Sequence, residues 1–225
     1  MKVLGILCSV TLVGSLLTAL PTPLTSQTLN DRLSSSVQVR LNGVNTPDTV
    51  AEALYDAEMP GGIAVVHYCG GFPTRSLKPS TPSVRGLLDA VVSADPDYSW
   101  RVNEGVVNLT PRYVKLQFLD TKVSKLDLKL KTPDESLNAL LILPEVQNQA
   151  KKELGSRVVQ GSPYAFSTNG EGQQQKTISV MLSDTTVADA LNKIARAYGT
   201  AVWVLVKNEC NRSGRNTFSI KFIHN

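Results

Sequence analysis

The stretch that decides the fold is residues 81–102, TPSVRGLLDAVVSADPDYSWRV. Thr81 and Pro82 predict a helix start, because a proline in the first helical turn gives up no hydrogen bond. Pro96 ends this helix, and the alternating residues 98–102 predict a strand. The apolar positions of the helix fall on one face: Val84, Leu87, Leu88, Val91 and Val92.

The flanking sequence extends this unit into a small domain. Asn103-Glu104-Gly105 predicts a turn and Val106 to Leu109 a returning strand. Upstream, Thr49 and Glu52 form a capping-box pattern for a helix that ends near Met59. Further strands are predicted at Val37–Leu41, Ile63–Tyr68 and Ser76–Lys78. We therefore expect a β-α-β-β-α-β-β domain at 37–112, after a flexible polar lead-in at 28–36.

The remaining sequence, 113–225, carries the same kinds of pattern. Strands are predicted at Tyr113–Leu119, Leu126–Leu130, Ile178–Leu182, Ala201–Val206 and Thr217–Ile223. Helices are predicted after Thr132, from Pro144, and after Thr186 to Gly199. The polar, glycine-bearing stretch 161–175 predicts a loop.

Two internal matches indicate a repeat. Residues 49–54, TVAEAL, recur at 186–191 as TVADAL. Residues 76–102 also align without a gap on 179–205, which places Trp100 opposite Trp203. We therefore predict an α+β protein of tandem small domains, with 113–225 as a divergent second copy and with helices packed on short sheets.

Residues 37–111 resemble the secretin and TonB short N-terminal domain, abbreviated STN. The matching features are an apolar opening strand, the TVAEAL helix start at 49–54, the helix through Leu87 and Leu88, and the closing pattern from Tyr98 to Leu109. The resemblance covers about a third of the chain and rests on apolar positions, not on reactive residues.

The resemblance implies a small α+β domain of the bacterial envelope that binds other proteins. STN domains form the entry ring of secretin channels or the signalling domain of outer-membrane transporters. No plug, β-barrel or secretin pore follows these domains in the sequence, so we expect neither channel nor transporter function. The family offers no catalytic residues to transfer.

The N-terminus predicts export. Lys2 is followed by an apolar run, 3–20, and then by a tail of proline and small residues, which is typical of a secretory signal. We assign 1–27 to a signal peptide or an uncleaved anchor, because the run is nearly long enough to span a bilayer. The expected location is periplasmic or secreted.

Two cysteines remain after this segment, Cys69 and Cys210. In an oxidising compartment a disulfide between them is the simplest prediction, and two separate buried thiols are the alternative. With His67 and His224 they also complete the set of soft ligands for a Cys₂His₂ zinc site, although the close spacing of His67 and Cys69 disfavours it. We expect no metal and no cofactor.

Few residues suggest catalysis. His67 and Cys69 share one face of a predicted strand, but no third orienting residue is apparent. The acidic residues Asp95, Asp97 and Glu104 flank Pro96 and Gly105, so we interpret them as solvated turn residues.

Trp100 and Trp203, with His67, are the candidate interaction residues. Their equivalent positions in the two copies favour a packing role for both tryptophans.

The composition, with 42% hydrophobic and 19% charged residues and a net charge of +4, is that of a globular protein without a nucleic-acid-binding run of basic residues. The leading hypothesis is a non-catalytic, exported module whose partner is another envelope or secreted protein. The alternatives are a secreted hydrolase that uses His67 or a carboxylate, and a carbohydrate-binding or structural envelope subunit. Membrane contact is expected only through the N-terminal segment.

Overall fold

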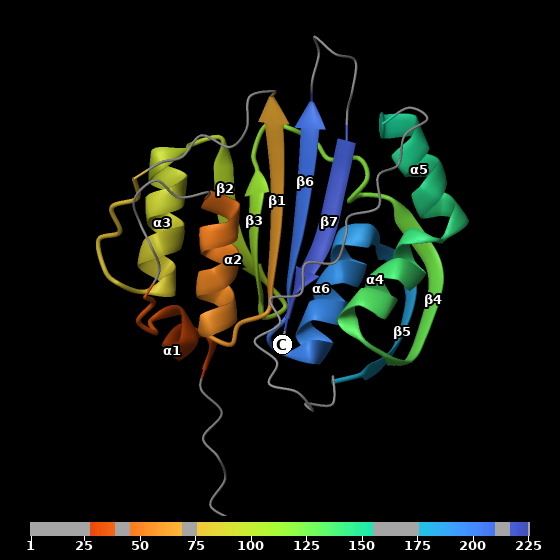
Figure 1. Ribbon diagram of the computed structural model, residues 1–225, viewed down its shortest axis with the longest axis horizontal. Helices are drawn as coiled ribbons and strands as arrows, with labels where there is room; N and C mark the ends of the chain where they lie inside the picture. The colour runs from red at the N-terminus through yellow and green to blue at the C-terminus, as the bar shows by residue number, and fades with distance from the viewer. Residues whose placement is uncertain (1–27, 39–45, 69–75, 155–175, 210–216, 225) are drawn as a thin grey trace, which may run out of the picture.

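The computed structural model describes residues 28–38, 46–68, 76–154, 176–209 and 217–224 (Figure 1). The helices are α1 (Leu29–Leu33), α2 (Thr46–Asp56), α3 (Val84–Ala94), α4 (Pro133–Leu141), α5 (Pro144–Leu154) and α6 (Val187–Tyr198). The strands are β1 (Gly61–Tyr68), β2 (Tyr98–Asn103), β3 (Val106–Pro111), β4 (Lys122–Lys131), β5 (Ile178–Thr186), β6 (Val202–Glu209) and β7 (Thr217–Ile223). The α+β fold class predicted from the sequence is confirmed.

One five-stranded sheet, in the order β2-β3-β1-β6-β7, forms the centre of the molecule. Its middle strand, β1, runs parallel to both neighbours and pairs with β6 along its whole length, from Gly61 opposite Val202 to Tyr68 opposite Glu209. The outer strands β2 and β7 each close an antiparallel hairpin. Since parallel strands are covered on both faces, β1 reads as a continuous apolar run from Gly61 to Val66.

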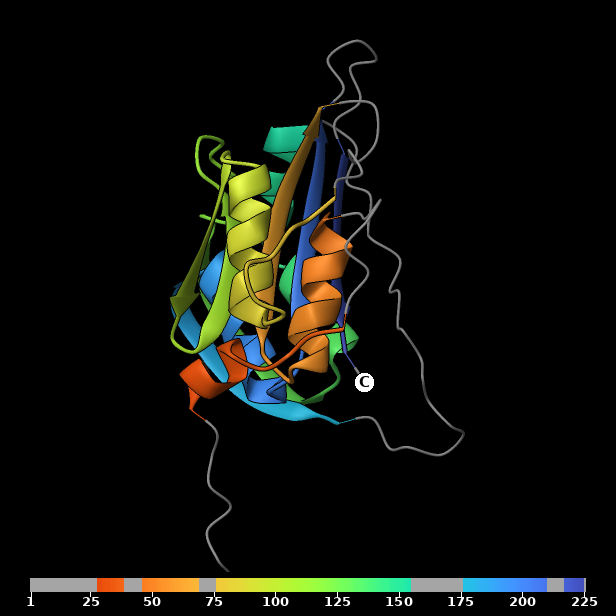
Figure 2. The same cartoon turned by 90° about the vertical axis from the view of Figure 1, so that its left-hand side faces the viewer.

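The two faces of the sheet bury separate cores (Figures 1 and 2). Ile63 and Val65 of β1 lie in the core under α1, α2 and α3. Ala64 and Val66 point to the opposite core, under α4, α5 and α6. The alternation along one strand therefore serves two helical layers.

A second, two-stranded antiparallel sheet of β4 and β5 covers the core on the α6 side. We call it the β4–β5 ribbon. Leu126 and Leu128 of β4 and Leu182 of β5 are buried in that core. The hydroxyl of Tyr198, in α6, donates a hydrogen bond to the carbonyl oxygen of Lys131 and so fixes the end of the ribbon to the helix.

Strands from 37–112 and from 113–225 belong to the same sheet, because β1 and β3 come from the first segment and β6 and β7 from the second. The predicted arrangement of tandem domains, each with its own short sheet, is therefore not confirmed. The physical reason is that β1 has no polar face to leave exposed, so it needs a neighbour on each edge and a helical layer on each side.

The ungapped internal match is nevertheless visible locally. Ser83 caps α3 by accepting a hydrogen bond from the Gly86 amide, and Thr186 caps α6 by accepting one from the Asp189 amide. These two caps are aligned with each other in the match between 76–102 and 179–205. The predicted cap at Thr81 is wrong by two residues, because the side chain of Ser83 satisfies the free amide.

Four further sequence predictions differ from the structure. The lead-in at 28–36 contains α1, whose Thr28–Asp31 capping box and buried Leu33 order it. Thr49 lies inside α2 and does not cap it. Residues 76–78 form no strand, although Leu77 is buried. Residues 113–119 are also not a strand, since Leu119, Asp120 and Thr121 bond back three residues in successive turns.

Other predictions stand or lie outside the described residues. The helices predicted after Thr132, from Pro144 and after Thr186 are confirmed as α4, α5 and α6. The predicted strands fall on β4, β5, β6 and β7, of which the first three extend beyond the predicted ranges: Leu126–Leu130, Ile178–Leu182, Ala201–Val206 and Thr217–Ile223. Part of the predicted strand at 37–41 lies outside the described residues. The whole of the predicted loop at 161–175 also lies outside them. No helix in the described ranges is both long enough and apolar enough to cross a bilayer.

Candidate functional site

Trp203 is a core residue. It is 1% exposed, and its indole nitrogen donates a hydrogen bond of 2.9 Å to Oδ1 of Asn192 in α6. The ring lies against Gly62 of β1: a Cβ atom at Gly62 would fall 2.2 Å from the indole. The predicted packing role of Trp203 is confirmed, and a ring buried in this way offers no binding surface.

Trp100 makes the corresponding contact at the other side of the sheet. Its indole nitrogen donates to Oδ1 of Asp89 in α3, also at 2.9 Å, and the guanidinium of Arg85 lies 5.6 Å from the ring centroid. The side chain is half-buried, so part of the ring remains accessible. Trp100 therefore packs its strand against its helix as predicted.

His67 lies near the end of β1, opposite Asn208 of β6, and is 8% exposed. Strand alternation places it on the same face as Ile63 and Val65. Burial lowers the pKa of His67 below its ordinary value, so the imidazole is neutral at pH 7. A neutral histidine is competent as a base, but a substrate would have to reach it through a packed sheet face.

The cysteines predicted to form a disulfide, Cys69 and Cys210, lie outside the described residues. The second histidine of the sequence, His224, is 4% exposed and its Nε2 lies 3.6 Å from a carboxylate oxygen of Asp134. Within the part of the chain that is described, no three His, Cys, Asp or Glu side chains gather as a metal site would require.

The acidic residues near the β2–β3 hairpin, Asp95, Asp97 and Glu104, do not converge on one site. The backbone carbonyls of Asp95 and Asp97 accept hydrogen bonds from Tyr98 and Arg112, as turn residues do. Glu104 occupies the tight turn between β2 and β3, where it and Gly105 have φ of 48° and 82°. Its carboxylate accepts a hydrogen bond of 2.9 Å from Arg196 of α6, and its carbonyl one of 3.2 Å.

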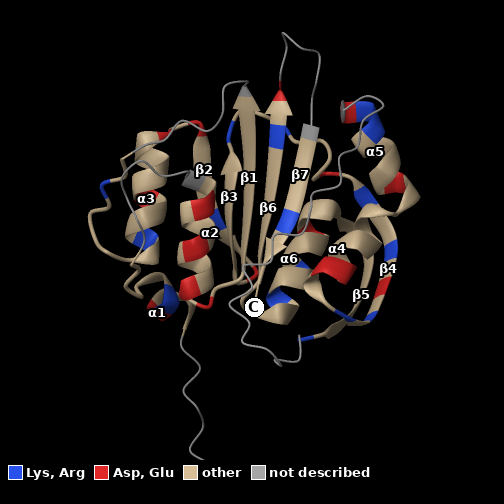
Figure 3. Cartoon of the chain, in the orientation of Figure 1, with Lys and Arg blue, Asp and Glu red and all other residues tan. Residues whose placement is uncertain are grey.

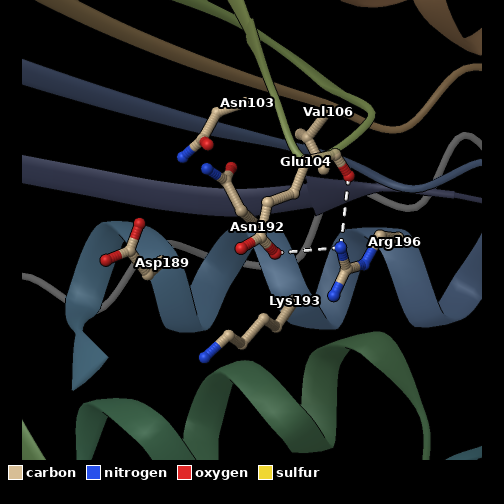
Figure 4. Close-up of a pocket in the computed structure, with 7 residues that line it drawn as sticks. All are labelled: Asn103, Glu104, Val106, Asp189, Asn192, Lys193 and Arg196. Atoms are coloured by element: carbon tan, nitrogen blue, oxygen red, sulfur yellow. Dashed lines mark hydrogen bonds and ion pairs between the residues drawn. The ribbon is translucent and has the colours of Figure 1, made fainter. Parts of the chain in front are cut away.

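This contact closes one side of a cavity of about 300 Å³ between the β2–β3 turn and α6 (Figure 4). We call it the α6 cavity. All but one of its lining residues are polar or charged: Asn103, Glu104, Val106, Asp189, Asn192, Lys193 and Arg196. Sequence reasoning missed it, because its two walls are 92 residues apart along the chain; only Glu104 had been singled out.

A buried ion pair was also missed. The ammonium of Lys207 in β6 lies 3.0 Å from Glu153 of α5 and 2.7 Å from Glu209. Burial by itself lowers the pKa of Lys207, but hydrogen bonds and charge from Glu209 and Glu153 outweigh it, so the pKa is raised. The other oxygen of Glu153 accepts the amide of Phe118 at 2.8 Å. These contacts fix α5 to the sheet, which is a structural role.

The β4–β5 ribbon carries an apolar exposure that its sequence pattern does not predict. Leu126, Leu128 and Leu130 alternate, so all three were expected on one face. Leu126 and Leu128 are buried, but Leu130 is 74% exposed. The register shifts between Leu128 and Lys131, and Leu130 has a φ of 49°. A β-bulge with left-handed backbone therefore turns this leucine away from the core.

Met181 adds a second exposed apolar side chain to the ribbon. It is 70% exposed and lies opposite Asp127 of β4. Four lysines also lie on β4: Lys122, Lys125, Lys129 and Lys131. Lys129 pairs with Asp127 and Lys131 with Glu135, whereas Lys122 and Lys125 have no ion-pair partner in the described ranges. Figure 3 shows these basic positions along β4.

Comparison of the chain with protein-family models, with curated proteins and with solved structures finds no match.

Proposed function

We propose that this protein is an exported, non-catalytic module of the bacterial envelope, related to the STN domains, and that it binds another protein through the β4–β5 ribbon. The observation that carries the proposal is Leu130. Burying a leucine side chain stabilises a fold by about 1.5–3 kcal/mol, and the exposed Leu130 does not contribute this free energy. Its left-handed backbone costs a non-glycine residue about 1–2 kcal/mol more. Strained backbone of this kind is kept mostly at functional sites, and a strand residue held in this way can serve as a contact point for a partner.

The strand edges of the ribbon support the same proposal. Each of β4 and β5 has one strand neighbour among the described residues, so each has a second edge that no described strand pairs with. At Ser124 of β4 the backbone amide donates to the carboxylate of Glu145 in α5. Such edges take up an extended segment of a partner. Lysines on an edge strand also oppose uncontrolled pairing, so the partner needs compensating negative charge. The fitting partner is an extended segment that combines apolar and acidic side chains.

The buried polar groups favour a binding role over a hydrolase. Asn192 and the pair Lys207–Glu153 hold elements together, and His67 is packed within a sheet face. The local correspondence of Trp100 and Trp203 supports descent from a duplicated STN-like unit, and the apolar N-terminal run supports export.

Photo-crosslinking in living cells tests the proposal. A photoreactive phenylalanine analogue replaces Met181 in one strain and, as the matched control, Arg101 of β2 in another; both positions are exposed. We expect one discrete adduct from position 181, none of that size from position 101, and loss of the adduct when Leu130→Lys is added. An adduct containing only a second copy of this chain, or equal adducts at both positions, would contradict the proposal.

A further inference from the structure

The α6 cavity is separate from the ribbon and has its own chemistry. Its floor is α6, which presents Asp189, Asn192, Lys193 and Arg196, and its roof is the end of the β2–β3 hairpin (Figure 4). At about 300 Å³ it lies at the small end of the range for small-molecule sites, roughly 300–1,000 Å³.

Asn192 fixes a hydrogen-bond donor in this cavity. An indole N–H can only donate, so the atom of Asn192 that faces Trp203 must be the amide oxygen. The NH₂ group is thereby oriented, and no hydrogen bond involves it within the described part of the chain. Asn192 is 8% exposed and lines the cavity. The amide nitrogen is therefore an oriented donor that is open to the cavity and can bond to a ligand there.

The charges of the cavity cancel. Arg196 and Glu104 neutralise each other through their 2.9 Å contact. One carboxylate oxygen of Asp189 accepts a hydrogen bond from the Thr186 hydroxyl at 2.8 Å, and Lys193 has no ion-pair partner in the described residues. Apart from the Arg196–Glu104 pair, the cavity holds one cation, Lys193, one anion, Asp189, and the amides of Asn103 and Asn192. Such a lining disfavours a ligand of net charge.

Both donors and acceptors line the cavity, and only Val106 contributes an apolar side chain. A hydroxyl group both donates and accepts, so several adjacent hydroxyls match this lining better than an apolar ring does. We infer that the α6 cavity binds a small, uncharged, hydroxyl-rich ligand of monosaccharide size. This inference does not depend on the proposed protein-binding role of the ribbon.

Titration of the ¹⁵N-labelled protein with glucose, galactose and N-acetylglucosamine tests the inference. We expect at least one of these sugars to shift the side-chain NH₂ signal of Asn192 and to bind more tightly than glucuronate, an anion, or glycine, a zwitterion. The inference fails if none of the three sugars shifts that signal, or if glucuronate or glycine binds more tightly than all of them.

Matched variants locate the binding. Asn192→Asp keeps the acceptor for Trp203 and removes the donor, and we expect sugar affinity to fall about tenfold, as for one lost hydrogen bond. Asp89→Asn at the aligned position in α3 lies outside the cavity and should leave affinity unchanged. Lys193→Ala and Asn103→Ala do not touch Trp203, and should also weaken binding if Asn192→Asp fails to fold. Unchanged affinity in every folded cavity variant would overturn the inference.

Discussion

The indole nitrogen of Trp203 donates to the side-chain oxygen of Asn192, and the indole nitrogen of Trp100 donates to that of Asp89, in each case 2.9 Å away and 11 residues back in the chain. The two pairs occupy aligned positions of the internal match. They differ in burial, because Trp203 is 1% exposed and Trp100 half-buried. A neutral amide replaces the carboxylate where burial would penalise a charge.

Because the two pairs differ in burial, removing the hydrogen-bond acceptor of each tryptophan should destabilise the fold by different amounts. Asn192→Leu leaves the Trp203 N–H buried without an acceptor, so we expect the free energy of unfolding to fall by about 1–3 kcal/mol. Asp89→Leu should cost less than about 1 kcal/mol, because water can reach the half-buried Trp100. Urea denaturation of both variants measures this. Equal losses would show that the two contacts are not distinguished by burial.

Gly62 is required for steric reasons. A Cβ atom there meets three indole atoms of Trp203 at 2.2 to 2.5 Å, and the fully buried ring has little room to move. We expect Gly62→Ala to destabilise the fold by about 1–3 kcal/mol or more. Gly105→Ala is the comparison. A Cβ atom at Gly105 meets no atom within 4 Å, but the residue has a φ of 82°. The substitution should therefore destabilise the fold by about 1 kcal/mol through backbone strain. Thermal unfolding that finds Gly62→Ala as stable as the wild type would refute the packing of Trp203.

Replacing Lys207 should strongly destabilise the fold. Lys207→Met leaves Glu153 buried without its cation, and we expect a loss of about 3–5 kcal/mol in the free energy of unfolding. Adding Glu153→Gln should restore part of that loss. Lys115→Met, at an exposed pair whose side chains are 79% and 56% accessible, should cost less than about 1 kcal/mol. Guanidinium denaturation measures both losses. If Lys115→Met loses as much free energy of unfolding as Lys207→Met, the stabilising role of the buried ion pair is contradicted.

His67 predicts a pH dependence. Burial lowers its pKa in the folded state below the ordinary value of 6.5, so the unfolded chain binds a proton more readily below that pH. Stability from His67 is therefore complete above about pH 6.5 and declines as the pH falls toward the folded-state pKa. We expect His67→Asn to flatten the decline between pH 7.5 and pH 5 in urea-denaturation series. The same slope in both proteins would show that His67 does not titrate as predicted.

Local structure could be predicted from the sequence more fully than its assembly. The apolar periodicity of α3 and α6, the alternation of β4 as far as Leu128 and the apolar run of β6 indicate the type of each element. They do not say which strand edges meet, so the pairing of β1 with β6 between the two halves was missed. The strand predicted at Tyr113–Leu119 rests on the alternation of Leu116 and Phe118 with polar residues. In the structure both side chains are buried, but the backbone there forms successive turns.

The candidate surfaces were less accessible to prediction. Alternation places Leu130 with Leu126 and Leu128, and nothing in the residue types marks the bulge that exposes it. The α6 cavity depends on Glu104 and Arg196, which meet only because α6 packs on the sheet against β1 and β3. By contrast, the shared position of Trp100 and Trp203 in the internal match was enough to predict their packing.

Amide hydrogen exchange tests the role of the ribbon most directly. The protein is measured alone and with the partner recovered from the position-181 adduct. We predict slower exchange at backbone amides of β4 and β5 on binding, with α2 and α3 unchanged, because a partner strand would satisfy the ribbon's edge groups. Protection confined to α2 and α3, or no change in the ribbon with bound partner, would contradict the account.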